Sequence, residues 1–145
     1  MDHPTYDPDL AEMLRGDDML GTGLPAYLGI RTVDVGPGTM TAELDVRPEL
    51  LNPFGSAHGG VLAALVDHVL GAVLYPVIPR GSWAATTQLN LNFTAPAREG
   101  TLRARSEIIS ISKRTAVVRI DVECGDRLIG AAQGTVTITP PRPAG

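Results

Sequence analysis

The sequence predicts an α+β domain in which an antiparallel β-sheet wraps around one long, buried α-helix. Two strand-like segments come first, an almost wholly apolar run over residues 59–78 follows, and four more strand-like segments complete the chain. Helical and strand patterns in separate blocks are typical of α+β domains. With 145 residues and 43% hydrophobic content, the chain suffices for one domain with a core.

Overall charge and cysteine content exclude several classes of function. The net charge is −4 and the pI is about 5.2, so we expect neither nucleic acid nor an anionic membrane surface as the main partner. Cys124 is the only cysteine, which excludes an internal disulfide and fits a reducing compartment. Residues 1–9 lack the basic and apolar regions of a signal peptide, so we expect a cytoplasmic protein.

Before the apolar run, the sequence predicts a polar segment, a hairpin and a loop. Residues 1–23 are polar and acidic and hold at most one short helix, near residues 8–15. Turn residues 36–39 then separate two strands, at residues 27–35 and 40–46. A loop follows at residues 48–57. We place the domain itself at residues 24–139 and a short tail at 140–145.

The apolar run is predicted to be a core helix. Its length would suit a membrane span, but Asp67 and His68 lie at its centre, where a charge costs several kcal/mol. The helix should begin near Ser56 or Ala57, with Ser56 as its cap, and continue to Tyr75. Its stability must come from burial against a sheet or a partner, because three glycines weaken it: Gly59, Gly60 and Gly71.

Four strands are predicted after the helix, at residues 85–94, 101–112, 115–124 and 128–139. In the first strand, alternation places one set of residues on one face, Thr87, Leu89, Leu91 and Phe93, and a second set on the other face, Thr86, Gln88, Asn90 and Asn92. The alternation of the second slips at Ile108-Ile109, which indicates a β-bulge. The third alternates cleanly and should direct four residues into the core: Ala116, Val118, Ile120 and Val122.

Residues with chemical potential surround the start of the predicted helix. Asn52 supplies a side-chain amide in the preceding loop, His58-Gly59-Gly60 opens the helix, and Asp67 is a semi-buried carboxylate in its apolar middle. A helix N-terminus holds anions, and a semi-buried carboxylate is suited to proton transfer or nucleophilic attack.

Helix geometry decides whether one chain completes such a site. A helix advances about 1.5 Å per residue, so Gly59 and Asp67 lie about 12 Å apart, and His58 lies about 13 Å from Asp67 on the opposite face. A reacting carbon must approach both an oxyanion donor and the carboxylate within about 3–3.5 Å. Two antiparallel copies meet this requirement. The spacing therefore predicts a site that is assembled twice across a two-fold dimer.

The ordered motifs resemble those of the hot-dog-fold thioesterases, and most closely the phenylacetic-acid-pathway (PaaI-like) acyl-CoA thioesterases. The shared features are Leu28-Gly29-Ile30, the Asn-x-x-Gly-x-x-His-Gly-Gly block from Asn52, Leu91-Asn92-Phe93 with Pro96 and Gly100, and Ala131-Ala132-Gln133-Gly134-Thr135. They cover residues 24–139. The resemblance implies a hot-dog fold, hydrolysis of an acyl-CoA to a free acid and CoA, and a homodimer that often pairs into a homotetramer.

The resemblance also implies roles for individual residues. Asp67 would be the catalytic carboxylate, and the Gly59 N–H would polarise the thioester carbonyl. Thr86 falls where some members place a hydroxyl that orients water, and the adjacent Thr87 fits equally well. Asp67 would act as a general base or attack the carbonyl to give a mixed anhydride, with the partner helix N-terminus offsetting its burial. Two further side chains would shape the carbonyl site: Asn52 and His58.

Structural alternatives remain open for several of these residues. The sequence is also compatible with purely structural roles. Asp67 could be an inert carboxylate, Asn52 a turn residue, and His58 a residue that fixes the loop by hydrogen bonding. His68 is expected to pack in the core or an interface. Ser56, His58 and Asp67 form no hydrolase triad, because one chain keeps Asp67 out of reach and no nucleophile elbow is present. We expect no metal or other cofactor, since zinc-ligand spacing is missing among His3, His58, His68 and Cys124.

CoA carries phosphates, so basic groups are expected at the mouth of the pocket. Lys113 and Arg114 in a hairpin turn are the first candidates, Arg98 is a weaker one, and Gly60 is a candidate substrate-binding residue beside Gly59. Aromatic and medium-chain aliphatic acyl groups suit the pocket equally. Its length could be set by Phe54, Leu62, Val66, Leu89 or Trp83.

Two other functions compete with hydrolysis. The first is a non-catalytic acyl-CoA-binding hot-dog protein, such as a ligand-sensing regulator. The acidic charge and the lack of an attached DNA-binding segment argue against this function. The second is a hydratase or dehydratase, which would pair a histidine and an aspartate differently around the helix. The Asn52 and Asp67 pattern favours the thioesterase.

Overall fold

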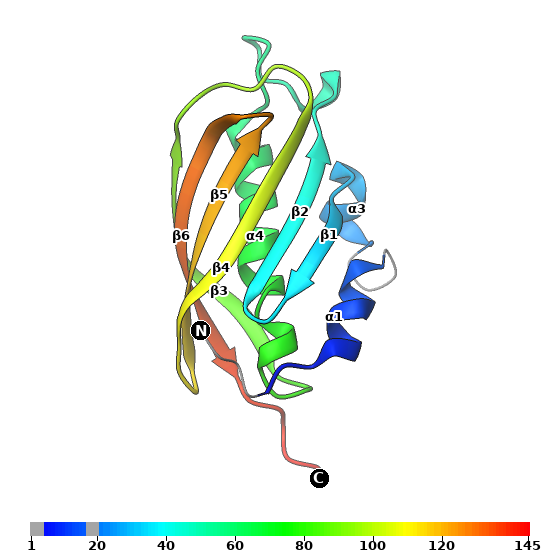
Figure 1. The fold of residues 1–145 in the computed structure, drawn as a ribbon, viewed down its shortest axis with the longest axis vertical. Helices are drawn as coiled ribbons and strands as arrows, with labels where there is room; N and C mark the ends of the chain where they lie inside the picture. The colour runs from blue at the N-terminus through cyan, green and yellow to red at the C-terminus, as the bar shows by residue number, and fades with distance from the viewer. Residues whose placement is uncertain (1–4, 17–20) are drawn as a thin grey trace.

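The computed structural model describes residues 5–16 and 21–145 and confirms the predicted architecture, an antiparallel sheet wrapped around one long helix (Figure 1). The helices are α1 (Pro8–Arg15), α3 (Gly23–Leu28) and α4 (Gly59–Ala72), and short 3-10 turns lie at Pro48–Leu50 and Tyr75–Val77. The strands are β1 (Arg31–Gly36), β2 (Thr39–Asp45), β3 (Trp83–Phe93), β4 (Thr101–Ile111), β5 (Thr115–Cys124) and β6 (Arg127–Thr139). His3, on which the zinc-spacing prediction partly depended, lies outside the described residues.

The sheet has the strand order β1-β2-β4-β5-β6-β3, and every neighbouring pair is antiparallel. β1 and β3 are therefore the two edges. The chain crosses from β2 through α4 before it adds β3 at the far edge, so one side of the helix packs against strands from both halves of the sequence.

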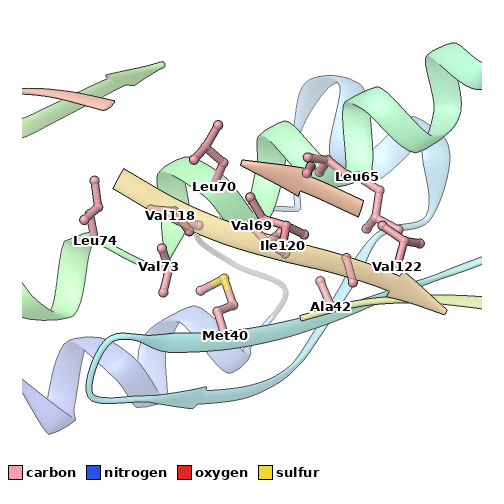
Figure 2. Packing of buried hydrophobic residues seen from close by; sticks show 14 of the residues in the cluster. Met40, Ala42, Leu65, Val69, Leu70, Val73, Leu74, Val118, Ile120 and Val122 are labelled. Carbon is pink, nitrogen blue, oxygen red and sulfur yellow. The ribbon is translucent and has the colours of Figure 1, made fainter. Parts of the chain in front are cut away.

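The core lies between α4 and the concave face of the sheet. Figure 2 shows Leu65, Val69 and Leu70 of α4 near Val118 and Ile120 of β5. Burial of one such side chain contributes about 1.5–3 kcal/mol, which exceeds the cost of about 1 kcal/mol for a glycine in a helix. The four predicted core positions of β5 are all buried. Although Gly59–Val77 is long and apolar enough to cross a membrane, most of it is buried, as in a soluble core helix.

The N-terminal boundary of the first predicted strand is wrong. Residues 23–28 form α3, and β1 begins only at Arg31. Gly29 ends α3 at a φ of +74°, where its N–H bonds to the carbonyls of Ala26 and Pro25. A residue in this left-handed conformation ends a helix and favours glycine. The apolar pattern before Arg31 thus belongs to a short helix whose Leu28 enters the core.

The predicted start and cap of the central helix are also wrong. α4 begins at Gly59 and ends at Ala72, earlier than the predicted Tyr75. His58, rather than Ser56, is its N-cap, because the His58 side chain accepts a hydrogen bond from a backbone N–H of the first turn. A histidine at this position was not anticipated, since oxygen-bearing side chains are the usual caps.

Register shifts interrupt four of the described strand pairs, and two of them bear on the predicted alternation of the strands. The predicted bulge in β4 is confirmed by a register shift between Ile108 and Ser110. A second bulge lies in β3 between Thr86 and Gln88, where the sequence predicted unbroken alternation. Because Thr87 is an extra residue, the side chains before it lie on the opposite side of β3 from the one that unbroken alternation would give them.

Candidate active site

The loop before α4 is organised by Asn52. Its side-chain oxygen accepts the N–H groups of Phe54 at 2.9 Å and Ser56 at 3.2 Å, and its own N–H donates to the Ser56 carbonyl at 2.7 Å. Asn52 therefore stabilises this turn, and its role at the carbonyl site stays a prediction. Among the described residues nothing accepts a hydrogen bond from the Asn52 Nδ2 group, which leaves this amide free to donate.

His58 leaves one backbone donor of the helix N-terminus unused. Its Nδ1 accepts the N–H of Gly60 at 2.8 Å, so the neutral imidazole carries its proton on Nε2. The Gly59 N–H is the first of the helix and has no hydrogen-bond acceptor within the described part of the chain. A Cβ at Gly60 would lie 3.0 Å from His58 Nδ1, so glycine there permits the cap.

A cavity of about 370 Å³ opens beside this N–H. Its walls come from the loop before α4, the first turns of α4 and the segment after β3. Phe93 was not predicted as a site residue. The signal in the sequence was its position at the end of the alternating apolar face of this strand. The lining residues are Asn52, Ser56, Ala57, Gly59, Leu62, Phe93, Thr94, Ala95, Pro96 and Ala97.

Asp67 lies outside this cavity. It is exposed in the single chain, so the prediction of a semi-buried carboxylate is wrong for one copy of the protein. It stands on the open face of α4, eight residues from Gly59 and thus about 12 Å along the axis. Its neighbours on this face are small: Gly60, Ala63, Ala64 and Gly71.

The bulge in β3 distinguishes Thr86 from Thr87. Thr86 pairs with the buried Val136, and directly paired residues share one face of a sheet, so Thr86 lies on the helix-facing side. Thr87 is the extra residue of the bulge, and its hydroxyl donates to the Thr135 carbonyl at 3.3 Å. The predicted grouping of Thr87 with Leu89 is therefore wrong.

The predicted CoA-binding residues lie at opposite ends of the sheet. Arg98 is beside the cavity, where its guanidinium donates to the Phe54 carbonyl at 3.1 Å. Lys113 and Arg114 are exposed in the β4–β5 turn. The Arg114 carbonyl accepts the N–H of Ile138 in β6, which pairs with Ala84 near the start of β3. Figure 1 shows this turn at the end of the molecule opposite to the start of α4.

The sequence profile of the thioesterase superfamily matches residues 54–131, which is more than half of the chain. The chain belongs to this superfamily. It is 31% identical over 100 residues to a 1,4-dihydroxy-2-naphthoyl-CoA hydrolase of Listeria monocytogenes, covering 69% of this chain and 81% of that protein. It is 28% identical over 94 residues to human acyl-coenzyme A thioesterase 13, covering 64% of this chain and 66% of that protein.

A solved structure extends the likeness to the PaaI-like branch. The phenylacetic acid degradation protein PaaI from Thermus thermophilus superposes with a TM-score of 0.72 at 27% identity, covering 78% of this chain and 96% of that one. The predicted hot-dog fold and the predicted PaaI-like resemblance are confirmed, and the chain is a thioester hydrolase.

This thioesterase also carries a half-buried histidine, His68, next to Asp67. The Nε2 atom of His68 is buried without a hydrogen-bond partner in the described part of the protein. Burial lowers the pKa of His68 below its usual 6.5, and the nearby Asp67 charge opposes this shift. His68 is therefore a packed, neutral residue near neutral pH, as predicted for a core or interface position.

Proposed function

We propose that the protein hydrolyses an acyl-CoA thioester to a free carboxylic acid and CoA, at two equivalent sites between two copies of the chain. In each site, Asp67 of one copy faces Gly59 and Asn52 of the other. The observation that carries the proposal is the separation of the free Gly59 N–H from Asp67, about 12 Å along one rigid helix. Two antiparallel α4 helices bring the N-terminus of each to the middle of its partner.

The two edges of the sheet support this pairing. β1 is six residues long, is broken by a bulge at Thr32/Asp34, and is covered by α1, whose Arg15 donates to the Val35 carbonyl at 2.7 Å. β3 is eleven residues long, contains no charged residue or proline, and pairs only with β6 among the described strands. A long uncharged edge is a template for pairing with another chain. We assign β3 to the seam of a homodimer.

The open face of α4 supports the same seam. The small residues around Asp67 let the backbone of a second helix approach closely, because they present almost no side chain. Enclosure by the partner would remove Asp67 from water, and desolvation disfavours a charged carboxylate. The partial positive charge at the partner's helix N-terminus offsets this cost.

In the proposed reaction, the thioester carbonyl oxygen lies against the Gly59 N–H, with the Asn52 amide as a second donor. Asp67 takes a proton from water, the hydroxide adds to the carbonyl carbon, and the C=O electron pair moves to the oxygen. Loss of one such oxyanion donor typically costs about 2.7–4 kcal/mol of transition-state stabilisation. Collapse then breaks the C–S bond, and the CoA thiolate receives the proton from Asp67. The Thr86 hydroxyl orients the water.

A covalent course is also compatible with the same groups. The Asp67 carboxylate would attack the carbonyl carbon, expel CoA as its thiolate and form a mixed anhydride, which water then cleaves. Turnover in isotopically labelled water identifies this course if the label appears in the Asp67 carboxylate. Both courses consume only water and the thioester, so the proposal includes no cofactor. The pairing of dimers into a homotetramer stays a prediction.

Thiol release from a panel of acyl-CoA thioesters tests the function. The panel includes aromatic and medium-chain aliphatic acyl groups, because apolar residues such as Leu62 and Phe93 line the cavity and the Listeria relative is a hydrolase of an aromatic acyl-CoA. We expect Asp67→Asn to lower kcat by about 10²- to 10⁴-fold, the usual contribution of a general base. Equal turnover would refute the role of Asp67. Tight binding of acyl-CoA without release on any substrate would instead identify the protein as a non-catalytic binder.

A further inference from the structure

We infer that Arg98 and Arg127 form a phosphate-binding site at the mouth of the Gly59 cavity, which holds the nucleotide phosphates of CoA. The inference rests on the proposed function, because it concerns how the carrier of that same substrate is bound.

The two arginines reach the rim of the cavity from different segments of the chain. Arg98 follows the cavity-lining segment after β3, and its Nη1 donates to the carbonyls of Phe54 at 3.1 Å and Gly55 at 3.4 Å. Arg127 opens β6, and its Nη2 donates to the carbonyl of Pro96, which lines the cavity. Both guanidinium groups are thus tethered by neutral backbone acceptors at the rim.

Their charges are not neutralised. Six other arginines have a carboxylate oxygen within 4.0 Å: Arg15, Arg31, Arg47, Arg80, Arg103 and Arg105. Within residues 5–16 and 21–145, neither Arg98 nor Arg127 has such a partner, although Glu99 and Asp126 are their neighbours in sequence. Both guanidinium groups are exposed at the rim without a direct ion pair among the described residues, so their charges stay available to an anionic ligand.

The chemistry of the guanidinium group identifies the ligand. Each carries five N–H donors in a planar fork that matches the oxygens of a phosphate, and the tethering bonds occupy only part of them. An acyl group in the cavity requires its pantetheine arm to leave past the rim, and the arm ends in the phosphates of the nucleotide. Arg98 and Arg127 lie on this exit, whereas Lys113 and Arg114 of the same chain lie at the other end of the sheet.

Kinetics with a truncated carrier test this site. The same acyl group is presented on CoA, on dephospho-CoA and on pantetheine to the wild type, Arg98→Ala and Arg127→Ala. We expect each variant to lower kcat/KM for acyl-CoA about tenfold, mainly through KM, because a charge-assisted contact made equally in ground and transition states is lost. Turnover of acyl-pantetheine should keep its wild-type value. The matched control is Arg119→Ala, an exposed arginine of β5 that also lacks an ion-pair partner in the described structure.

Arg98 also holds the loop before α4, so a second variant separates its two contributions. Arg98→Gln keeps an amide that donates to the Phe54 carbonyl but removes the charge, and it should show the same selective loss as Arg98→Ala. Equal losses on acyl-CoA and acyl-pantetheine would reduce Arg98 to a loop support and overturn the inference. A loss confined to Lys113→Ala/Arg114→Ala would also overturn it, because the phosphates would then bind the hairpin of a partner copy.

A failure of the proposed function would look different. If the wild type releases thiol from none of the thioesters, calorimetric binding of adenosine 3′,5′-bisphosphate still tests the site alone. We expect about tenfold weaker binding to Arg98→Ala than to the wild type and the Arg119→Ala control. Equal affinities would contradict the inference.

Discussion

Phe93 packs its ring against the bare backbone of Gly59. A Cβ added to Gly59 would lie 3.1 Å from Phe93 Cζ and 3.2 Å from Cε1, closer than ordinary van der Waals contact. Phe93 is 59% exposed in the single chain and shares the cavity wall with Gly59. The free N–H of α4 is therefore presented next to an aromatic wall, and the glycine is required for this close approach.

The first prediction concerns this contact. Gly59→Ala should displace the Phe93 ring into the cavity and lower kcat/KM by about tenfold, with little change in melting temperature, because an exposed ring moves easily. Phe93→Leu in the same chain should restore part of the loss. The double-mutant cycle on kcat/KM measures the coupling. Strictly additive effects would show that the ring and the glycine act independently.

The second prediction separates Thr86 from Thr87, which differ in their place at the bulge. Thr86→Val should lower kcat by about tenfold, since its hydroxyl lies on the helix-facing side and is proposed to orient water. Thr87→Val should leave kcat unchanged and cost about 1 kcal/mol of unfolding free energy, because its hydroxyl bonds only within the sheet. A loss of kcat in Thr87→Val but not in Thr86→Val would mean that Thr87, and not Thr86, places its hydroxyl on the helix-facing side.

The third prediction follows from the buried Nε2 atom of His68. Burial lowers its pKa in the folded state below the 6.5 of the unfolded chain, so the unfolded state binds more protons between the two values. The stability is complete above pH 6.5 and decreases as the pH falls below it, by at most about 1.4 kcal/mol per pH unit. Urea unfolding at pH 7.5 and 5.5 measures the decrease, which His68→Gln should reduce. An unchanged pH dependence in that variant would exclude His68 as its source.

The fourth prediction concerns the open face of α4. Ala63 is half-buried in the single chain, so Ala63→Trp should fold as a monomer but prevent a second helix from approaching. We expect sedimentation equilibrium to give a dimer for the wild type and a monomer for the variant, together with loss of thioester hydrolysis. Circular dichroism verifies that the variant is folded. An active dimeric Ala63→Trp protein would remove this face from the interface.

Much of the fold could be predicted because local patterns and burial agree. β5 alternates cleanly, since each of its residues faces either the core or solvent, and its predicted bounds match the structure. The start of β1 could not be predicted, because an apolar run before Arg31 suits a short helix as well as a strand. The bulge at Thr87 is one extra residue in a strand, and the His58 cap is one hydrogen bond, so neither leaves a periodic signal in the sequence.

The exposure of Asp67 shows a different limit of sequence-based prediction. An apolar helix with almost no polar residues predicts that its whole surface is covered, and the sheet of one chain covers only part of it. In the proposed dimer, a second copy would cover the part of α4 that the chain's own sheet leaves open. The sequence predicts Asn52, Gly59 and Asp67 as one set of site residues, and this set stays a prediction. Cavity walls such as Phe93 required the tertiary structure.

The central claim is that each site takes Asp67 from one copy and Gly59 from the other, and purified mixed dimers test it most directly. Asp67→Ala and Gly59→Val chains with different affinity tags are co-expressed, and dimers that carry both tags are isolated. Each variant alone should be inactive, whereas the mixed dimer should recover about half of the wild-type kcat, because one of its two sites is intact. A folded mixed dimer as inactive as its parents would contradict the account.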